Sequence, residues 1–320
     1  MRRPAGDGPV RRATRRMSLA VLCSGQGRQE RGMFAMFAGE PAARPVLAAA
    51  AARLGWDSLS HLDRLSDAEL FANRTGQLLC VARALAAVAV LDEVLPPDAI
   101  VAGYSVGELA AWGVAGLWSP SETLDLADGR ARAMDAASGA DDGLAYVRGL
   151  PLDRIEALAA RFGCEIAIVN PDRLTILGGA TADLTALCEA ALAGGALRAA
   201  PMPVHVASHT SRLAAAADDF LDRARAIPVR RPRRALMSAT GPRLHRAVAP
   251  DVASLAGQIA TTIDWNAVLD ALYERGVRRL IELGPGQSLA AMARGQSRFD
   301  ARALDEFDGL AGVAAWIGKV

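Results

Sequence analysis

Residues 103–108 read GYSVGE, and this stretch joins two segments with different patterns. The apolar run DAIVAG at 98–103 predicts a short buried strand, whereas VGELAAWGVAGL at 106–117 has apolar residues at roughly helical spacing. Ser105 therefore falls at a strand-to-helix junction. A serine between two glycines at such a junction is the pattern of a nucleophile elbow.

The elbow predicts a defined local geometry. Gly103 and Gly107 leave room for a sharp turn, the Ser105 hydroxyl stands exposed above the sheet edge, and the Val106 amide points at the same place. An ordinary glycine-rich turn between a strand and a helix is the alternative. A nucleophilic serine also needs a base and donors for an oxyanion, so the rest of the chain decides between the two.

Composition limits the class of protein. The chain has 320 residues, of which 52% are apolar and 5% aromatic, and its net charge is +1. This length suits one large or two modest domains with an aliphatic core. We expect no nucleic-acid partner and no membrane span, because the charge is balanced and no run of 18 apolar residues lacks charges or turn signals.

The four cysteines (Cys23, Cys80, Cys164 and Cys188) are widely spaced and form no Cys-x-x-Cys or Cys/His cluster. They predict buried thiols in a reducing, cytoplasmic compartment, with no disulfide and no metal site.

Residues 1–16 hold six arginines and almost no large apolar side chain. We interpret them as a disordered basic arm, or as an over-called start that precedes a true initiator at Met17. A targeting peptide is the alternative.

The order of strand and helix patterns predicts an α/β fold. Strands and helices alternate over residues 17–137 and again over 205–320, which indicates a hydrolase-like core with a parallel sheet. Residues 138–204 instead show the order βαββαβ, which is typical of a ferredoxin-like unit. We therefore expect an inserted ferredoxin-like subdomain over 138–204.

The candidate base is a histidine that follows the elbow. Among four histidines, His205 and His209 lie in MPVHVASHT, four positions apart, so in an extended segment they would face the same way. We prefer His209, because it ends the apolar run just before a helix predicted at Ser211, and strand ends present catalytic groups. His205 is then a packed or surface histidine.

The loop SGQGRQERG at 24–32 offers backbone donors. Gly25 and Gly27 let the chain around Gln26 approach a bound carbonyl oxygen closely. The amides of Gln26 and Val106 would then form a two-donor oxyanion hole. A plain turn between a strand and a helix is the alternative for this loop.

Five segments together resemble the malonyl-CoA:acyl-carrier-protein transacylases and the related acyltransferase domains of polyketide synthases. They are SGQGRQERGM, GYSVGE, DGRARAM, VASH and ELGPG, and the resemblance extends from about Ser18 to Arg294. It implies a serine acyltransferase with malonyl-CoA as donor and the phosphopantetheine-type thiol of an acyl carrier protein as acceptor. No bound cofactor is implied.

The resemblance also implies roles for single residues. Ser105 would carry the acyl group, and His209 would be its base, oriented by the backbone carbonyl of Gln258. Arg130 would bind the free malonyl carboxylate with its planar fork; the alternative is a solvated helix charge. Asn170, in IAIVNPD, matches a recurrent asparagine near the substrate cleft, or is a turn residue.

The chain departs from the family at two positions, because Ser24 replaces a usual proline and Tyr104 a usual histidine. These features resemble the epsilon subunit of malonate decarboxylase, with its other subunits as implied partners. A trans-acting enzyme of polyketide or fatty-acid synthesis is an alternative, and the VASH segment does not decide between malonyl and methylmalonyl as the acyl group.

A serine hydrolase would need an acidic residue between Ser105 and His209 to orient the histidine. A docking subunit would have no use for Ser105, His209 and Arg130 together.

Overall fold

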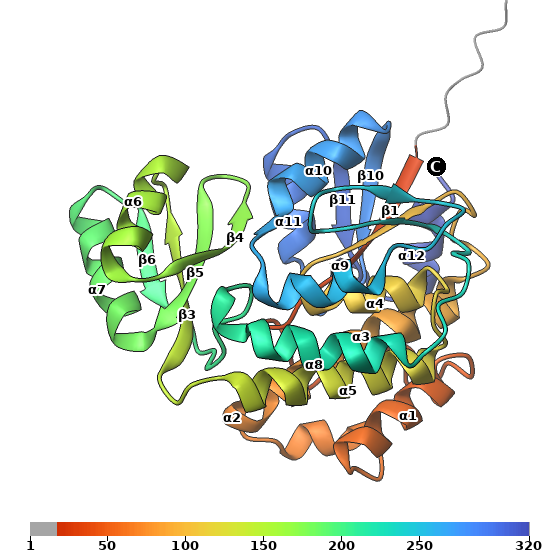
Figure 1. Cartoon of the computed structure of the whole chain (residues 1–320). Helices are drawn as coiled ribbons and strands as arrows, with labels where there is room; N and C mark the ends of the chain where they lie inside the picture. The colour runs from red at the N-terminus through yellow and green to blue at the C-terminus, as the bar shows by residue number, and fades with distance from the viewer. Residues whose placement is uncertain (1–17, 320) are drawn as a thin grey trace, which may run out of the picture.

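The computed structural model describes residues 18–319 and confirms the predicted α/β fold (Figure 1). The predicted arm at 1–16 lies outside the described residues. A six-stranded sheet has the order β11-β10-β1-β2-β7-β8, in which every pair is parallel except β7 with β8. The strands of this sheet are β1 (Ser18–Cys23), β2 (Ile100–Gly103), β7 (Ala235–Met237), β8 (Leu244–His245), β10 (Val277–Glu282) and β11 (Asp300–Ala303).

Helices cover both faces of this sheet. Side chains alternate between the two faces along each strand, so each face presents apolar residues that a layer of helices buries. Leu19, Val21 and Cys23 of β1 belong to one hydrophobic cluster, and Ala20 and Leu22 belong to the other. The α-helices that contribute to the first cluster are α1 (Arg44–Leu54), α2 (Asp67–Leu70), α3 (Asn73–Leu91), α4 (Val106–Val114), α5 (Pro120–Ala137), α8 (Ala214–Arg225), α9 (Val252–Gly257) and α12 (Leu310–Ile317). The second cluster includes α10 (Trp265–Glu274) and α11 (Ser288–Gly295).

One described helix, α3, is long and apolar enough to cross a membrane by length and composition alone. However, 72% of the segment is buried inside the protein. It packs between α1, α4 and α5 in the core (Figure 1). Its apolar composition is therefore accounted for by burial.

A second sheet of five strands has the order β6-β3-β5-β4-β9. Its first four strands are joined by antiparallel pairs in the ferredoxin-like order, and α6 and α7 pack on one face. The elements of this unit are β3 (Asp142–Arg148), α6 (Leu152–Phe162), β4 (Glu165–Asn170), β5 (Leu174–Ala180), α7 (Thr181–Ala193) and β6 (Arg198–Pro201). All of them lie within residues 138–204, whose boundaries as a subdomain stay a prediction.

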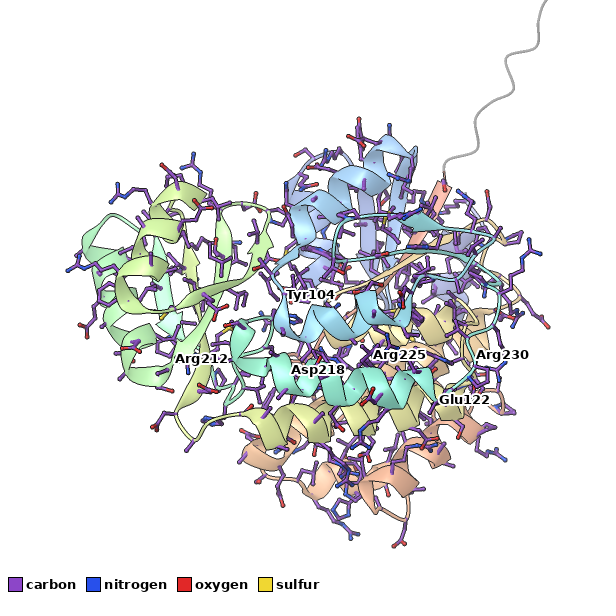
Figure 2. The ribbon with its side chains drawn as sticks, viewed as in Figure 1. Tyr104, Glu122, Arg212, Asp218, Arg225 and Arg230 are labelled. Atoms are coloured by element: carbon purple, nitrogen blue, oxygen red, sulfur yellow. The ribbon has the colours of Figure 1, made fainter. Side chains whose placement is uncertain are left out.

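Two features join this unit to the core. The short strand β9 (Ile263–Asp264), directly before α10, adds to the edge of the second sheet in parallel with β4. Arg212 lies in the turn before α8 and is labelled in Figure 2. It forms an ion pair with Asp142 at the start of β3, with 2.9 Å between Nη1 and Oδ1. The segment that leads into α8 is thus anchored to both parts of the molecule.

The elbow glycines allow β2, α4 and β1 to approach closely. A Cβ added at Gly103 would lie 2.0 Å from the carbonyl oxygen of Gly107, and one at Gly107 would lie 2.1 Å from that of Cys23. Real side chains do not reach such distances to backbone atoms. These contacts place Ser105 at the carboxyl end of β2, beside the end of β1.

Gly107→Ala should therefore lower the free energy of unfolding by about 3 kcal/mol or more, because the methyl group meets a backbone that cannot rotate away. Urea denaturation of both proteins measures the difference. Gly257→Ala is the matched control, since no atom lies within 4 Å of a Cβ there and its φ of −58° is helical. It should be neutral or stabilise by up to about 1 kcal/mol. Equal effects of the two substitutions would contradict the close-approach argument.

Candidate active site

Ser105 has a backbone conformation that serine rarely adopts. It lies between β2 and α4 with φ 56° and ψ −124°. A non-glycine residue held at positive φ costs about 1–3 kcal/mol and persists only where its surroundings enforce it, which is typical of functional sites. The contacts of Gly103 and Gly107 enforce it here, and the hydroxyl lines a pocket of about 90 Å³.

His209 contacts this serine directly. Its Nε2 lies 2.8 Å from Ser105 Oγ, and its Nδ1 lies 2.7 Å from the backbone oxygen of Gln258. A carbonyl oxygen can only accept a hydrogen bond, so the ring proton is on Nδ1 and Nε2 is free to accept from the serine hydroxyl. The structure thus brings Ser105, His209 and Gln258 into one chain of hydrogen bonds.

The expectation that His205 and His209 face the same way is wrong. The segment before His209 is not a regular strand: the amides of Val204 and Ser208 each donate to the carbonyl two residues earlier, and His209 has φ 64°. These turns leave His205 exposed and His209 buried. His205 lines a different pocket of about 580 Å³, which shares Gln26 with the pocket of Ser105.

His209 is held in its neutral form. Burial lowers the pKa of His209 to about 3, and the positive charge of Arg130 acts in the same direction, while the hydrogen bond to Gln258 opposes both. An imidazole with this pKa is unprotonated at neutral pH. It can therefore accept the serine proton without first losing one of its own.

Arg130 is a buried cation and not a solvated helix charge. It lies on α5, only 1% of its surface is exposed, and it lines the same pocket as Ser105. Its Nη1 donates to Oε1 of Gln77 at 2.7 Å, and its Nη2 donates to Oε1 of Gln258 at 3.5 Å. Burial lowers the pKa of Arg130 to about 10, which keeps it charged at neutral pH.

Among residues 18–319, the hydrogen bonds of the Arg130 side chain go to these two amide oxygens and to no carboxylate. The charge of Glu108 raises the pKa of Arg130, but the two side chains form no direct ion pair. A buried charge without a direct ion pair is costly, so the pocket is suited to a ligand that carries an anionic group. The start of α5 is fixed by a capping box, in which Glu122 N donates to Ser119 Oγ at 3.3 Å and Ser119 N to Glu122 Oε2 at 2.7 Å. This cap fixes the helix that carries Arg130.

The loop after β1 lies against the elbow. A Cβ at Gly25 would lie 2.9 Å from the carbonyl oxygen of Tyr104 and 3.5 Å from Cβ of Ser105. Gln26 lines the Ser105 pocket, and Val106 begins α4, where helical amides have no partner within the helix. Gln26 and Val106 thus both lie near Ser105, and their role as oxyanion donors stays a prediction.

Asn170, like Val106 and Gln258, is a predicted site residue that does not line this pocket. It ends β4 and is buried next to Tyr104, whose ring packs edge-on against Trp265 with 5.3 Å between centroids. Tyr104 itself lines the pocket. Asn170 therefore lies one layer behind it, and its role in substrate binding stays a prediction.

Sequence reasoning missed three polar side chains around Arg130. They are Gln77, the amide of Gln258 and the carboxyl group of Glu108, all buried. A signal was present for two of them, because Gln77 interrupts the apolar run of α3 and Glu108 belongs to GYSVGE itself. No pattern in the sequence indicates that the Gln258 side chain is used.

Residues 21–292 match the family described as acyl transferase domain, and the chain belongs to this family. The malonyl CoA-acyl carrier protein transacylase of Mycobacterium tuberculosis is 28% identical over 297 residues, which cover 88% of this chain and 93% of the relative. That of Salmonella typhimurium is 29% identical over 286 residues, covering 86% and 91%. The crystal structure of an acyl-carrier-protein S-malonyltransferase from Burkholderia pseudomallei is similar with a TM-score of 0.85 and 27% identity, covering 95% of this chain and all of that one.

The low pKa of His209 predicts the pH dependence of acylation. With the neutral ring as the predicted base, a lowered pKa should extend acylation to lower pH. With acetyl-CoA as the acyl donor, the acylation rate at pH 5.5 should stay close to that at pH 7.5. With an ordinary histidine pKa of 6.5, the acylation rate would instead fall about tenfold over this range.

Mass spectrometry of the intact protein in single-turnover reactions measures the rate, and a midpoint near pH 6.5 would contradict the burial argument. His205→Ala, at an exposed histidine, should give the same profile as the wild type.

Proposed function

We propose that this protein transfers a malonyl group from malonyl-CoA to the phosphopantetheine-type thiol of an acyl carrier protein, through an acyl-enzyme on Ser105. The proposal rests on one observation. A serine–histidine pair lines the same pocket as a buried arginine whose side chain forms no hydrogen bond to a carboxylate among residues 18–319. The pair fits acyl transfer, and the arginine fits an acyl group with a free carboxylate. Similarity to relatives named as malonyl transacylases supports the same assignment.

In the first half-reaction, Ser105 Oγ attacks the thioester carbonyl while His209 Nε2 takes its proton. The amides of Gln26 and Val106 donate to the oxyanion. The carbon–sulfur bond then breaks, and the proton on His209 passes to the CoA sulfur. In the second half-reaction, His209 takes the proton of the carrier thiol, the sulfur attacks the malonyl ester, and Ser105 regains its proton. No bound cofactor takes part.

Arg130 supplies the specificity for the acyl group. Its guanidinium would bind the malonyl carboxylate by two parallel hydrogen bonds, which compensate both charges away from water. An acetyl group leaves the cation without this partner. Methylmalonyl carries the same carboxylate, so Arg130 selects the class of dicarboxylic acyl groups and not one member of it.

The alternatives fit the site less well. His209 is oriented by a main-chain carbonyl, whereas a serine hydrolase of this architecture uses an aspartate or glutamate at that position. A docking subunit has no need for a strained serine paired with a neutral histidine.

The setting within a pathway is a finer proposal. We favour a role as the transacylase subunit of malonate decarboxylase, because Ser24 and Tyr104 resemble that branch of the family. The four cysteines are free and buried, which supports a cytoplasmic location. Transfer to the carrier subunit of a malonate decarboxylase at a higher rate than to a fatty-acid carrier protein supports the branch, and the reverse ranking contradicts it.

The nucleophile is tested by mass. Wild-type protein mixed with malonyl-CoA should gain one malonyl mass, and Ser105→Ala should gain none, because the alanine has no oxygen to acylate. Peptide mapping locates the adduct. An adduct that persists in the alanine variant would place the nucleophile elsewhere, and its absence from the wild type would contradict the proposed function.

The role of Arg130 is tested by substrate choice. Arg130→Ala should lower malonyl loading on the order of a hundredfold, as expected for a lost charge-assisted pair, and should spare acetyl loading. Arg130→Lys should recover only part of the loss, since an ammonium group cannot make the two-pronged contact. The ratio of malonyl to acetyl loading is the measurement. An unchanged ratio in the alanine variant would rule out Arg130 as the carboxylate site.

A further inference from the structure

Gln258 holds several parts of the site at once. Its main-chain oxygen accepts from Nδ1 of His209 at 2.7 Å. Its side-chain Oε1 accepts from Arg130, and its Nε2 donates to the backbone oxygen of Ser105 at 3.2 Å and to a carboxylate oxygen of Glu108. The residue is completely buried. One glutamine therefore contacts the nucleophile, the base and the specificity cation.

These partners fix which way the Gln258 amide points. Its NH₂ group faces the Ser105 carbonyl oxygen and an oxygen of Glu108, and in the ionised form of Glu108, which leaves both carboxylate oxygens free to accept, neither can donate. The Gln258 amide oxygen faces a guanidinium that can only donate. If the amide were turned over, Nε2 would face the Arg130 donors, and Oε1 would face the oxygens of Ser105 and Glu108. Each of these contacts would be repulsive, so only one orientation satisfies the network.

Glu108 is the ionisable group at the far end of this network. It lies in the first turn of α4, with 1% of its surface exposed. Its Oε1 accepts from the amide of Ala239 at 3.1 Å, and its Oε2 accepts from Gln258. Of its two partners, one is a fixed backbone group of the core, so Glu108 links the Gln258 side chain to a rigid part of the fold.

We infer that Glu108 is a positioning residue that acts through Gln258. By holding the Gln258 amide, it holds the main-chain carbonyl that orients His209 toward Ser105. Glu108 would not touch the substrate. The inference deepens the proposed function, since it concerns the same nucleophile and base.

Replacing Glu108 by glutamine should disturb this network although size and shape are kept. The new side chain has one acceptor oxygen, but two donors face it, from Ala239 and Gln258. Whichever way the new amide is turned, one donor meets the new NH₂ group instead of an acceptor. The link between Gln258 and the core is therefore weakened or lost.

Glu282 offers a matched control in the same molecule. It is as buried as Glu108, and burial likewise raises its pKa to about 7. It accepts from Ser24 Oγ at 2.8 Å and from the amide of Ala290 at 2.7 Å. A serine hydroxyl can donate or accept, so Glu282→Gln keeps both hydrogen bonds by reversing one of them. The same substitution is thus compatible at 282 and incompatible at 108.

The test is a double-mutant cycle on the reactivity of Ser105. The readout is the rate at which a small alkyl fluorophosphonate labels Ser105, followed by intact mass. In this reaction the serine oxygen bonds to phosphorus, fluoride leaves, and His209 takes the hydroxyl proton. The probe needs neither malonyl-CoA nor Arg130, so the result is independent of the proposed acyl group.

We expect Glu108→Gln to lower the labelling rate about tenfold, and Gln258→Leu, which lacks the side-chain amide, by a similar factor or more. The double variant should react like Gln258→Leu alone, because Glu108 has no route to the base once the amide is gone. Glu282→Gln should stay within about twofold of the wild type. If Glu108→Gln does not fold, Glu108→Asp, which keeps a carboxylate on a shorter side chain, replaces it in the cycle.

Two results would overturn the inference. One is a wild-type labelling rate for the Glu108 variant, and the other is a double variant whose loss equals the product of the two single losses. The second result would show that Glu108 and Gln258 act independently. Failure of malonyl-CoA to acylate the wild type, with normal labelling by the probe, would count against the proposed function and not against this inference.

Discussion

The hydrogen bond from Nδ1 of His209 to the main-chain oxygen of Gln258 is the constraint on which the rest of the site depends. It fixes the tautomer of the ring, and the tautomer decides that Nε2 accepts from Ser105. A neutral carbonyl also stabilises the protonated ring less than a carboxylate would. In a buried site beside Arg130, this leaves the histidine neutral with a strongly lowered pKa.

The choice of a carbonyl is consistent with the charge in the pocket. A carboxylate partner for His209 would place a second anion near the position proposed for the malonyl carboxylate, and it would compete for Arg130. The structure instead surrounds Arg130 with amide oxygens from Gln77 and Gln258. These groups accept two of its hydrogen bonds without neutralising it, so the positive charge remains available to a ligand. The nearest acid, Glu108, is kept behind the Gln258 amide.

Much of this arrangement could be predicted from the sequence. GYSVGE, with its strand before and helix after, defined the elbow, and the alternation of patterns predicted both the parallel sheet and the βαββαβ unit. Chain order restricted the candidate base to histidines after Ser105, and the position of His209 at the end of an apolar run favoured it over His205. The carbonyl of Gln258 and the function of Arg130 followed only from the family resemblance, because no local pattern marks a main-chain acceptor more than 100 residues from the serine it serves.

Other features could not be predicted, for physical reasons. His205 and His209 diverge because tight turns and a positive φ replace the extended strand that the alternation suggested. The edge strand β9 has two residues, too few to produce a pattern. The network of Gln77, Glu108 and Gln258 depends on three helices or turns meeting in space, and single-chain periodicity indicates that such side chains are buried but not what they contact.

The protonation of His209 is the most direct test of this account. Nitrogen NMR of the histidine ring in the wild-type protein reports both the tautomer and the pKa. We expect a ring protonated on Nδ1 whose signals stay constant from pH 8 down to about pH 5, because burial and Arg130 disfavour the imidazolium form. A ring that titrates near pH 6.5, or carries its proton on Nε2 when neutral, would contradict the central role of the Gln258 carbonyl.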